Sequence, residues 1–339
     1  MKSLMKRNEI YVGIIIILVS LIIGFANRTF FSFENLADLT RASTVNGIFA
    51  VGAYLVILSG GIDVSFPAIA TVSTYMTLQL FPADAPGGNL FLFFFVACLA
   101  GCIMGLINGI FIAYFRFPPL IVTLATSSLY YGIQFVFLGS FRINRMPQYI
   151  MDLSRARLLS LKIGNETYSI PFIFLFFLLI VLLAFLIMRY TVAGRELFAI
   201  GGNRSAAEVA GIPVKRRLLF VYGGAGVLAA LGGGLYSVMT RQGDPASLIG
   251  IEMTIISIVV LGGVDINGGK GSITGVILGL LFVTIINNSL ILIGVESYWH
   301  QLIIGITMFI NAAIVAYRGR LSRKKVKEVN LDDRAMQKR

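Results

Sequence analysis

Neutral polar side chains that interrupt apolar runs are the residues best suited to chemistry in this sequence. Hydroxyl and amide groups both donate and accept hydrogen bonds, so they suit an uncharged, polyhydroxylated solute, whereas a proton-coupled pathway would want buried carboxylates. Hydrogen bonding between membrane helices is the alternative use of such residues. The candidates for a solute pathway are Asn46, Thr123, Thr126, Ser127, Gln134, Asn287 and Asn288.

Two aspartates follow glycine pairs in similar short stretches. Asp63 ends the Gly-Gly-Ile-Asp of VILSGGID, and Asp265 ends the Gly-Gly-Val-Asp of VVLGGVD. Ionisable groups near a membrane often contact solute, so Asp63 and the neighbouring Ser65 join the candidate pathway. A carboxylate after two glycines is equally suited to closing a turn, and both interpretations stay open.

We expect neither catalytic residues nor a set of metal ligands in this chain. The stretch VDINGGKGS resembles a phosphate-binding loop, but Val264 stands where the first glycine belongs and Gly271 follows Lys270. The sequence therefore predicts no nucleotide site and no bound cofactor.

The composition is that of an integral membrane protein. The chain has 339 residues, 57% of them hydrophobic and 13% charged, whereas soluble domains carry about a quarter charged residues. The mean hydropathy is +0.86. Ten apolar runs predict membrane-spanning helices at 10–26, 44–59, 66–81, 91–114, 119–139, 171–189, 218–239, 254–264, 272–293 and 299–317.

The net charge of +12 is concentrated before the first span, in the loop around 189–217 and in the tail 318–339. Such clusters mark cytoplasmic ends, so both termini are predicted to be cytoplasmic, and nucleic-acid binding becomes the weaker interpretation. The first run is longer than the core of a usual signal peptide, which favours a retained span. The external segment 140–170 opposes the charge rule locally because it contains Arg142, Arg145, Arg155, Arg157 and Lys162.

Glycine patterns suggest an internal repeat. Gly101, Gly105 and Gly109 share the GxxxGxxxG spacing of Gly271, Gly275 and Gly279, and such faces let membrane helices pack closely. The matching spans run in opposite directions, which is typical of the inverted repeats of transporters. A general abundance of glycine in membrane helices is the alternative.

The segment GRELFAIGGNRSAAEVAGIPVKRR, between two predicted spans, contains a short helix. Ser205 and Glu208 have the spacing of a capping box, while Gly211 and Pro213 are suited to ending the helix. A helix of about one and a half turns is marginal by itself. Its alanine-rich surface is suited to entering a cleft on another protein.

These stretches, taken together, resemble the permease subunits of ribose-type ABC importers. The resemblance covers GRELFAIGGNRSAAEVAGI, LSGGIDVS, FPPLIVTLAT, IEMTIISIVVLGGVDINGGKGSITG and NNSLILIGVESYWHQLIIG. It implies one all-α permease domain over residues 1–339 in the bacterial inner membrane, with a cytoplasmic coupling loop at 190–217. It also implies an ATPase subunit that binds ATP and Mg²⁺, a second permease copy or paralogue, and a periplasmic solute-binding protein. The residues implied to contact the ATPase are Gly194, Arg195, Glu196, Gly202, Asn203, Ser205, Ala206, Ala207, Glu208 and Gly211.

The implied solute is a simple sugar, but other solutes and other classes of protein stay open. A nucleoside, an amino acid or an autoinducer-like molecule would use the same machinery. A secondary carrier working alone would need no ATPase, and a lipid-handling subunit would need no binding protein. The sequence departs from the family pattern at Phe66 and Pro67, and Pro67 is expected to kink the start of the third span.

Overall fold

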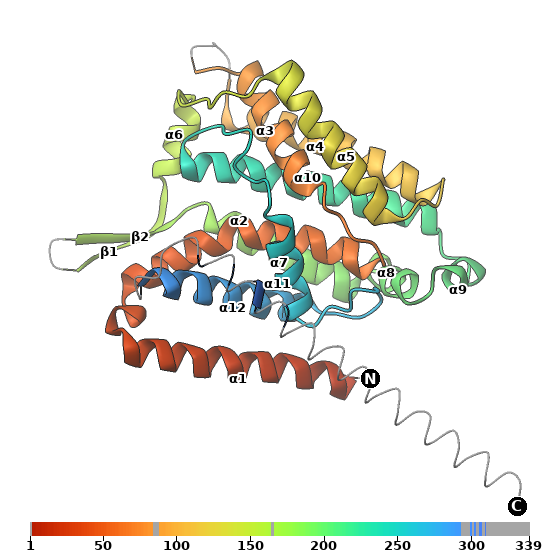
Figure 1. Ribbon diagram of the computed structural model, residues 1–339, viewed down its shortest axis with the longest axis horizontal. Coiled ribbons are helices and arrows are strands. Elements are labelled where there is room, and N and C mark those ends of the chain that lie inside the picture. Colours follow the sequence, from red (N-terminus) through yellow and green to blue (C-terminus); the bar gives the residue numbers. More distant parts are fainter. Residues whose placement is uncertain are drawn as a thin grey trace, which may run out of the picture.

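The computed structural model describes residues 2–83, 88–163 and 166–292, together with positions 299, 302, 305, 306 and 309. Most of these residues are helical (Figure 1). The elements in chain order are α1 (Lys2–Ala26), η1 (Arg28–Phe31), α2 (Phe33–Leu58), α3 (Phe66–Leu80), α4 (Leu90–Ala113), α5 (Pro119–Ile133), η2 (Gln134–Leu138), α6 (Gln148–Arg155), β1 (Arg157–Ile163), β2 (Glu166–Pro171), α7 (Phe174–Tyr190), α8 (Val192–Gly202), α9 (Arg204–Val209), α10 (Val214–Thr240), α11 (Glu252–Leu261) and α12 (Ile273–Leu292).

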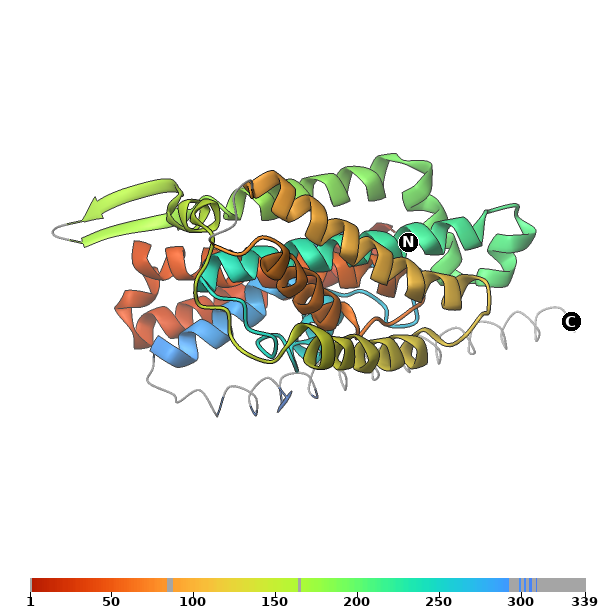
Figure 2. The ribbon, with the colours of Figure 1, turned by 90° about the horizontal axis from the view of Figure 1, so that it is seen from above.

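The long helices α1, α2, α10 and α12 run along the long axis of the molecule (Figure 1). The short helices α8 and α9 lie at one end, and α6 with the β1–β2 hairpin lies at the other (Figures 1 and 2). The long axis therefore separates a coupling-loop end from a hairpin end.

Among the described residues, four helices are long and apolar enough to cross a membrane: Phe33–Leu58, Leu90–Ala113, Pro119–Leu138 and Val214–Thr240. The pair α7 and α8, bent by 77°, adds a fifth if it is counted as one span. Shorter apolar helices cover Glu9–Phe25, Glu252–Leu261 and Ile273–Ser289. A multi-span helical protein is confirmed, while the count of ten spans and the side of the termini stay predictions. The predicted span 299–317 and the tail 318–339 lie outside the continuously described residues.

The expectation of an all-α chain is wrong for the segment 140–170, which was predicted to be external. Residues Arg157–Ile163 pair antiparallel with Glu166–Pro171, in register from Leu159 opposite Ile170 to Ile163 opposite Glu166. Apolar and polar residues alternate in LSLKI, which is the period of a strand with two different faces. The helix preceding the hairpin, α6, ends at Arg155.

Helix α10 is the centre of the bundle, and glycines let its neighbours approach. A Cβ atom at Gly226 would lie 2.1 Å from the carbonyl oxygen of Gly101 on α4, and one at Gly233 would lie 2.5 Å from that of Ala70 on α3. Gly232 meets the ring of Phe49 on α2 in the same way. Side chains larger than hydrogen would force these helices apart.

Both glycine stripes predicted from the sequence lie in helix contacts. Gly101 and Gly105 face α10, and Gly275 and Gly279 face α11, where added Cβ atoms would lie 2.1 to 2.4 Å from backbone oxygens. Close packing therefore explains the spacing. The inverted repeat stays a prediction.

The predicted kink at Pro67 is wrong. Pro67 lies in the first turn of α3, where its missing N–H removes no helical hydrogen bond. The departure from the family pattern is therefore compatible with a regular helix start.

Candidate functional site

A sharp bend after α7 turns the chain into the coupling segment, α8 and α9. Thr191 caps α8 by accepting a hydrogen bond from the backbone N–H of Gly194 at 3.2 Å. Gly194 is buried, and a Cβ atom there would lie 2.5 Å from the carbonyl oxygen of Met188. This predicted coupling residue therefore permits the 77° bend.

The predicted capping box at Ser205 is wrong. Helix α9 begins at Arg204, two residues before the start that a cap at Ser205 would give, and Asn203 caps it by accepting a hydrogen bond from Ala206 N at 3.0 Å. Asparagine is as strong an N-cap as serine, so the first of the two candidates is used. Gly211 has φ +81° after the helix end, as the sequence predicts.

Charged side chains fasten the coupling segment to the bundle. Arg204 donates to the carbonyl oxygen of Ala113, the last residue of α4, at 3.1 Å. Glu208 pairs with Arg116 at 3.0 Å, in the connection between α4 and α5. Glu196 on α8 pairs with Arg217 on α10. Two of the predicted ATPase contacts, Glu196 and Glu208, therefore form ion pairs within the chain.

The small-residue surface of α9 points both inward and outward. Ala207 is buried against the chain itself, which overturns the expectation that it fits into a cleft on another protein. Val209 is 91% exposed, and other predicted coupling residues are exposed beside it: Arg195, Gly202, Asn203, Ser205 and Ala206. The outward surface of α8 and α9 therefore remains available to a partner.

The end of α8 meets two loops backbone to backbone. Gly269 N donates to Leu58 O at 2.9 Å, and a Cβ atom at Gly201 would lie 1.9 Å from the same oxygen. Gly268 has φ +89°, and a Cβ atom there would lie 2.7 Å from the Cα of Gly60. We call this contact of Leu58, Gly60, Gly201, Gly268 and Gly269 the glycine junction. It joins the coupling segment to the α2–α3 and α11–α12 connections.

Both Gly-Gly-x-Asp echoes are helix ends of one kind. Gly60 and Gly263 have φ +88° and follow α2 and α11 as left-handed C′ residues. Asp63 Oδ1 then accepts a hydrogen bond from Ser65 N at 2.7 Å, and Asp265 Oδ1 accepts one from Asn267 N at 3.0 Å. These contacts favour turn formation over solute contact as the role of both carboxylates.

A buried polar cluster continues from the α2–α3 turn. Thr123 on α5 accepts a hydrogen bond from Val64 N at 3.3 Å, and Asn108 on α4 donates to Ser65 Oγ at 2.8 Å. Asn108 Oδ1 and the hydroxyl of Tyr222 on α10 are buried without a partner in the described chain. The predicted Asp63, Ser65 and Thr123 thus lie together. Asn108 was missed, although it too interrupts an apolar run.

The other pathway candidates are not gathered at this cluster. Gln134 is fully buried in the π-helical turn η2, and both of its amide atoms lack a partner in the described chain. Asn288 on α12 donates to Asn35 on α2, the contact expected of interhelical bonding. Thr126 bonds back to its own helix, and Asn46, Ser127 and Asn287 are half-buried. Their place in a solute pathway stays a prediction.

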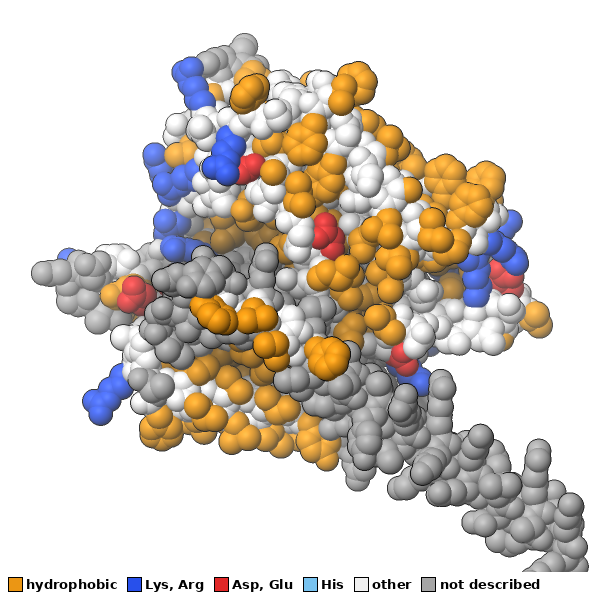
Figure 3. Space-filling model, in the orientation of Figure 1, with side chains coloured by type: hydrophobic (Ala, Val, Ile, Leu, Met, Phe, Trp, Pro, Cys, Tyr) orange, Lys and Arg blue, Asp and Glu red, His pale blue; other side chains and the backbone are white. Residues whose placement is uncertain are grey.

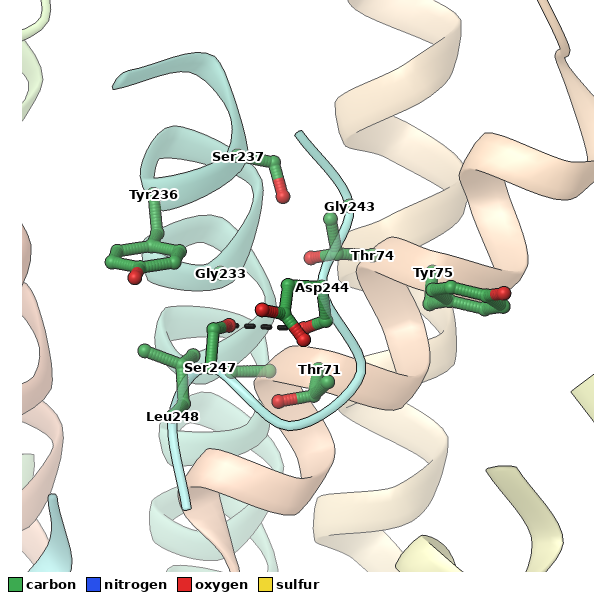
Figure 4. Close-up of a pocket in the computed structure, with 11 residues that line it drawn as sticks. Thr71, Thr74, Tyr75, Gly233, Tyr236, Ser237, Gly243, Asp244, Ser247 and Leu248 are labelled. Carbon is green, nitrogen blue, oxygen red and sulfur yellow. Dashed lines mark hydrogen bonds between the residues drawn. The ribbon is translucent and has the colours of Figure 1, made fainter. Parts of the chain in front are cut away.

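A second polar site lies at the hairpin end, where α3, α10 and the loop after α10 enclose a small cavity (Figure 4). Its volume is about 10 Å³, room for about one water molecule. The residues around it include Thr71, Thr74, Tyr236, Ser237, Asp244 and Ser247. Thr74 Oγ1 is buried without a hydrogen-bond partner in the described chain.

Three contacts close the loop 139–147 over this cavity. Arg142 Nε pairs with Asp244 Oδ2 at 2.8 Å, and Ile143 exchanges two backbone hydrogen bonds of 2.9 Å with Gly243. Tyr75 on α3 donates to Phe141 O at 2.9 Å. We call these contacts the outer latch. Sequence reasoning missed it, because RQGDPAS reads as an ordinary polar loop.

Comparison with known proteins identifies the family. Residues 35–312 match the family described as "Branched-chain amino acid transport system / permease component". The chain belongs to this permease family.

Several curated relatives of the permease cover nearly its whole length. The galactose/methyl galactoside import permease protein MglC of Salmonella typhimurium is 31% identical over 89% of this chain and 91% of its own. The ribose import permease protein RbsC of Bacillus subtilis is 31% identical over 91% and 92%. The autoinducer 2 import system permease protein LsrC of Escherichia coli is 28% identical over 95% and 90%. No solved structure matches the permease.

Family membership makes the chain a multi-pass membrane subunit of an ABC transporter that is not itself catalytic. The resemblance inferred from the sequence motifs is therefore confirmed. An ATPase and a solute-binding protein are the partners that an import permease of this family implies.

Proposed function

We propose that this permease forms the transmembrane path of a binding-protein-dependent ABC importer and carries a simple sugar into the cell. Relatives named for galactose and ribose import, about 30% identical over most of the chain, support a sugar as the solute. The polar cluster supports it as well, since Asn108, Thr123 and Tyr222 offer neutral hydrogen-bonding groups. Asp63 is held in its turn by Ser65.

The observation that carries the mechanism is the glycine junction. An ATPase that moves α8 and α9 would move Gly201. This residue lies against Leu58 at the α2–α3 connection and against Gly269 in the α11–α12 connection. Backbone contacts have no flexible side chain to absorb a displacement, so movement of α8 passes to Leu58 and Gly269. Solute access would change as the α2–α3 turn shifts against α5.

The proposed assembly places the exposed side of α8 and α9 against the ATPase subunit, in the bacterial inner membrane. A second permease copy or paralogue completes the path, and a periplasmic solute-binding protein delivers the solute at the hairpin end. ATP and Mg²⁺ bind the ATPase. The outer latch would close the hairpin end to solute, and Asp244 is only 9% exposed beneath Arg142.

Reconstitution tests the proposal. The permease is co-expressed with its neighbouring genes, the complex is placed in liposomes, and uptake of labelled ribose, galactose and autoinducer 2 is measured with ATP on the cytoplasmic side. We expect ATP-dependent uptake of one of the sugars and an ATPase in the purified complex. Uptake driven by an ion gradient, with no ATPase attached, would make the protein a secondary carrier instead.

A solute like autoinducer 2 is the second candidate. The relative LsrC is 28% identical over 95% of this chain, nearly as similar as the sugar permeases. Uptake of autoinducer 2 in preference to both sugars would favour this candidate and leave the ATP-driven mechanism in place.

A further inference from the structure

Three arginines from separate elements line one cavity at the hairpin end. Arg41 comes from α2, Arg157 from β1 and Arg241 from the residue after α10, and the cavity between them has a volume of about 200 Å³. Ser154 adds a hydroxyl, and Ile173 and Met239 add apolar walls. Figure 3 shows blue side chains gathered along the end of the molecule that carries α6 and the hairpin. We call this site the arginine cavity.

The positive charge of the arginine cavity is largely uncompensated within the described residues. Arg41 has a loose contact with Asp38 at 3.7 Å, whereas Arg157 and Arg241 form no ion pair in this part of the chain. Burial, together with the nearby charges of Arg41 and Arg241, lowers the pKa of Arg157. A bound anion would relieve this repulsion. A guanidinium group can bind a phosphate through two parallel N–H···O hydrogen bonds.

The cavity lies at the level where the spans end. Arg241 directly follows α10, and Ile173 directly precedes α7. Arg41 follows the polar first turns of α2, which contain Glu34 and Asp38, and precedes the apolar run of that helix. All three elements change from polar to apolar here, so the cavity is at the depth of lipid headgroups.

We propose that the arginine cavity binds the phosphate of an anionic phospholipid. The guanidinium groups hold the phosphodiester, and Ser154 positions two of them by accepting hydrogen bonds from Arg241 Nε at 2.9 Å and from Arg157 Nη1 at 2.8 Å. Ile173 and Met239 contact the start of the acyl chains. Basic pockets between membrane helices on the cytoplasmic side bind anionic headgroups, and the arginine cavity offers the same chemistry at the hairpin end. The site also gives Arg157 a use on a side of the membrane where the charge rule disfavours it.

The position of the cavity along α2 favours a lipid over an acidic surface of a folded partner. Arg41 is the ninth residue of the 26-residue α2, so the start of that helix projects about 12 Å beyond it. A folded external protein would meet the start of α2 and the hairpin first, whereas a lipid headgroup at the depth of the cavity would meet the exposed arginines directly.

Native mass spectrometry of the detergent-purified full-length chain tests the site. The probes are phosphatidylglycerol and phosphatidylcholine, with inorganic phosphate as a competitor. We expect the wild type to retain phosphatidylglycerol at least about tenfold better than Arg157→Glu or the triple change of Arg41, Arg157 and Arg241 to Gln, because charged hydrogen bonds are lost. Arg155→Gln, outside the cavity, is the matched control and should retain the lipid fully.

Each other outcome counts against the proposal. Equal lipid retention by the wild type and Arg157→Glu would overturn it. The single variant changes one residue on an exposed strand, so it keeps the test valid if the triple variant misfolds. Full displacement of the lipid by inorganic phosphate would indicate a site for free anions. Unchanged lipid retention with weakened binding of the solute-binding protein would assign the arginines to protein docking.

Discussion

Replacing Gly201 with alanine should separate ATP hydrolysis from solute movement. The added Cβ atom would lie 1.9 Å from Leu58 O and 2.5 Å from Gly269 N. Ordinary contacts of a Cβ atom begin near 3.4 Å, so α8 or the α2–α3 connection must shift by more than 1 Å. Both neighbours are backbone atoms, so no side-chain rotation relieves the clash.

The expected cost follows from overpacking, which destabilises a tight contact by about 1 to 3 kcal/mol. Alanine also favours helix by about 0.5 to 1 kcal/mol over glycine, which offsets part of this cost in the fold. A loss of about 1 to 3 kcal/mol in coupling corresponds to about a 5- to 150-fold change. The rate of ATP-driven uptake should therefore decrease by about 5- to 150-fold.

A helical glycine away from the coupling segment provides the control. Gly132 lies in α5, and a Cβ atom there would meet nothing within 4 Å. In liposomes containing the full complex, Gly201→Ala should retain the ATPase subunit and its ATP hydrolysis but show reduced uptake, whereas Gly132→Ala should resemble the wild type. If both variants transport equally well, the glycine junction does not carry the coupling.

Three further substitutions test other contacts. Asn203→Ala should weaken co-purification of the ATPase, since losing an N-cap costs about 0.5 to 2 kcal/mol, while Ser205→Ala should have little effect; the reverse order would restore the capping box. Val209→Trp adds a large side chain to the outward surface of α9 and should reduce ATPase binding measured by pull-down, with unchanged thermal stability of the permease alone; normal binding would remove this surface from the interface. Arg142→Gln breaks the ion pair with Asp244 in the outer latch and should raise ATP hydrolysis without solute; unchanged basal hydrolysis would argue against gating there.

The helices were predictable because apolar runs report burial in a membrane directly. The predicted span 66–81 begins where α3 begins and ends one residue later, and the predicted span 91–114 differs from α4 by one residue at each end. The hairpin was missed because the external segment was treated as one charged loop, although LSLKI alternates apolar and polar residues. Long apolar runs were therefore recognised as helices, while the short alternating pattern of the hairpin strands was overlooked.

The site was harder to predict because contacts between distant loops leave no local pattern. Asp63, Ser65 and Thr123 were chosen as pathway candidates for their polar or ionisable side chains, and only the structure shows that they lie together, while Asn108 needed the same criterion applied to α4. Gly201 was left out of the predicted coupling set. The atoms that Gly201 approaches are backbone groups of Leu58 and Gly269. Every residue has such groups, so no residue type in the sequence indicates this contact.

The glycine junction also gives the Gly-Gly-x-Asp echo a physical reason. Each echo ends a helix with a left-handed glycine and then turns through an aspartate, so that two similar connections reach the same helix, α8. Gly60 from the first connection and Gly268 from the second meet each other beside Gly201. A single displacement of α8 would therefore act on both connections at once, so we expect α3 and α12 to respond together. Gly268→Ala, which would place a Cβ atom 2.7 Å from the Cα of Gly60, should therefore reduce uptake while the ATPase remains bound, and normal uptake would contradict this coupling.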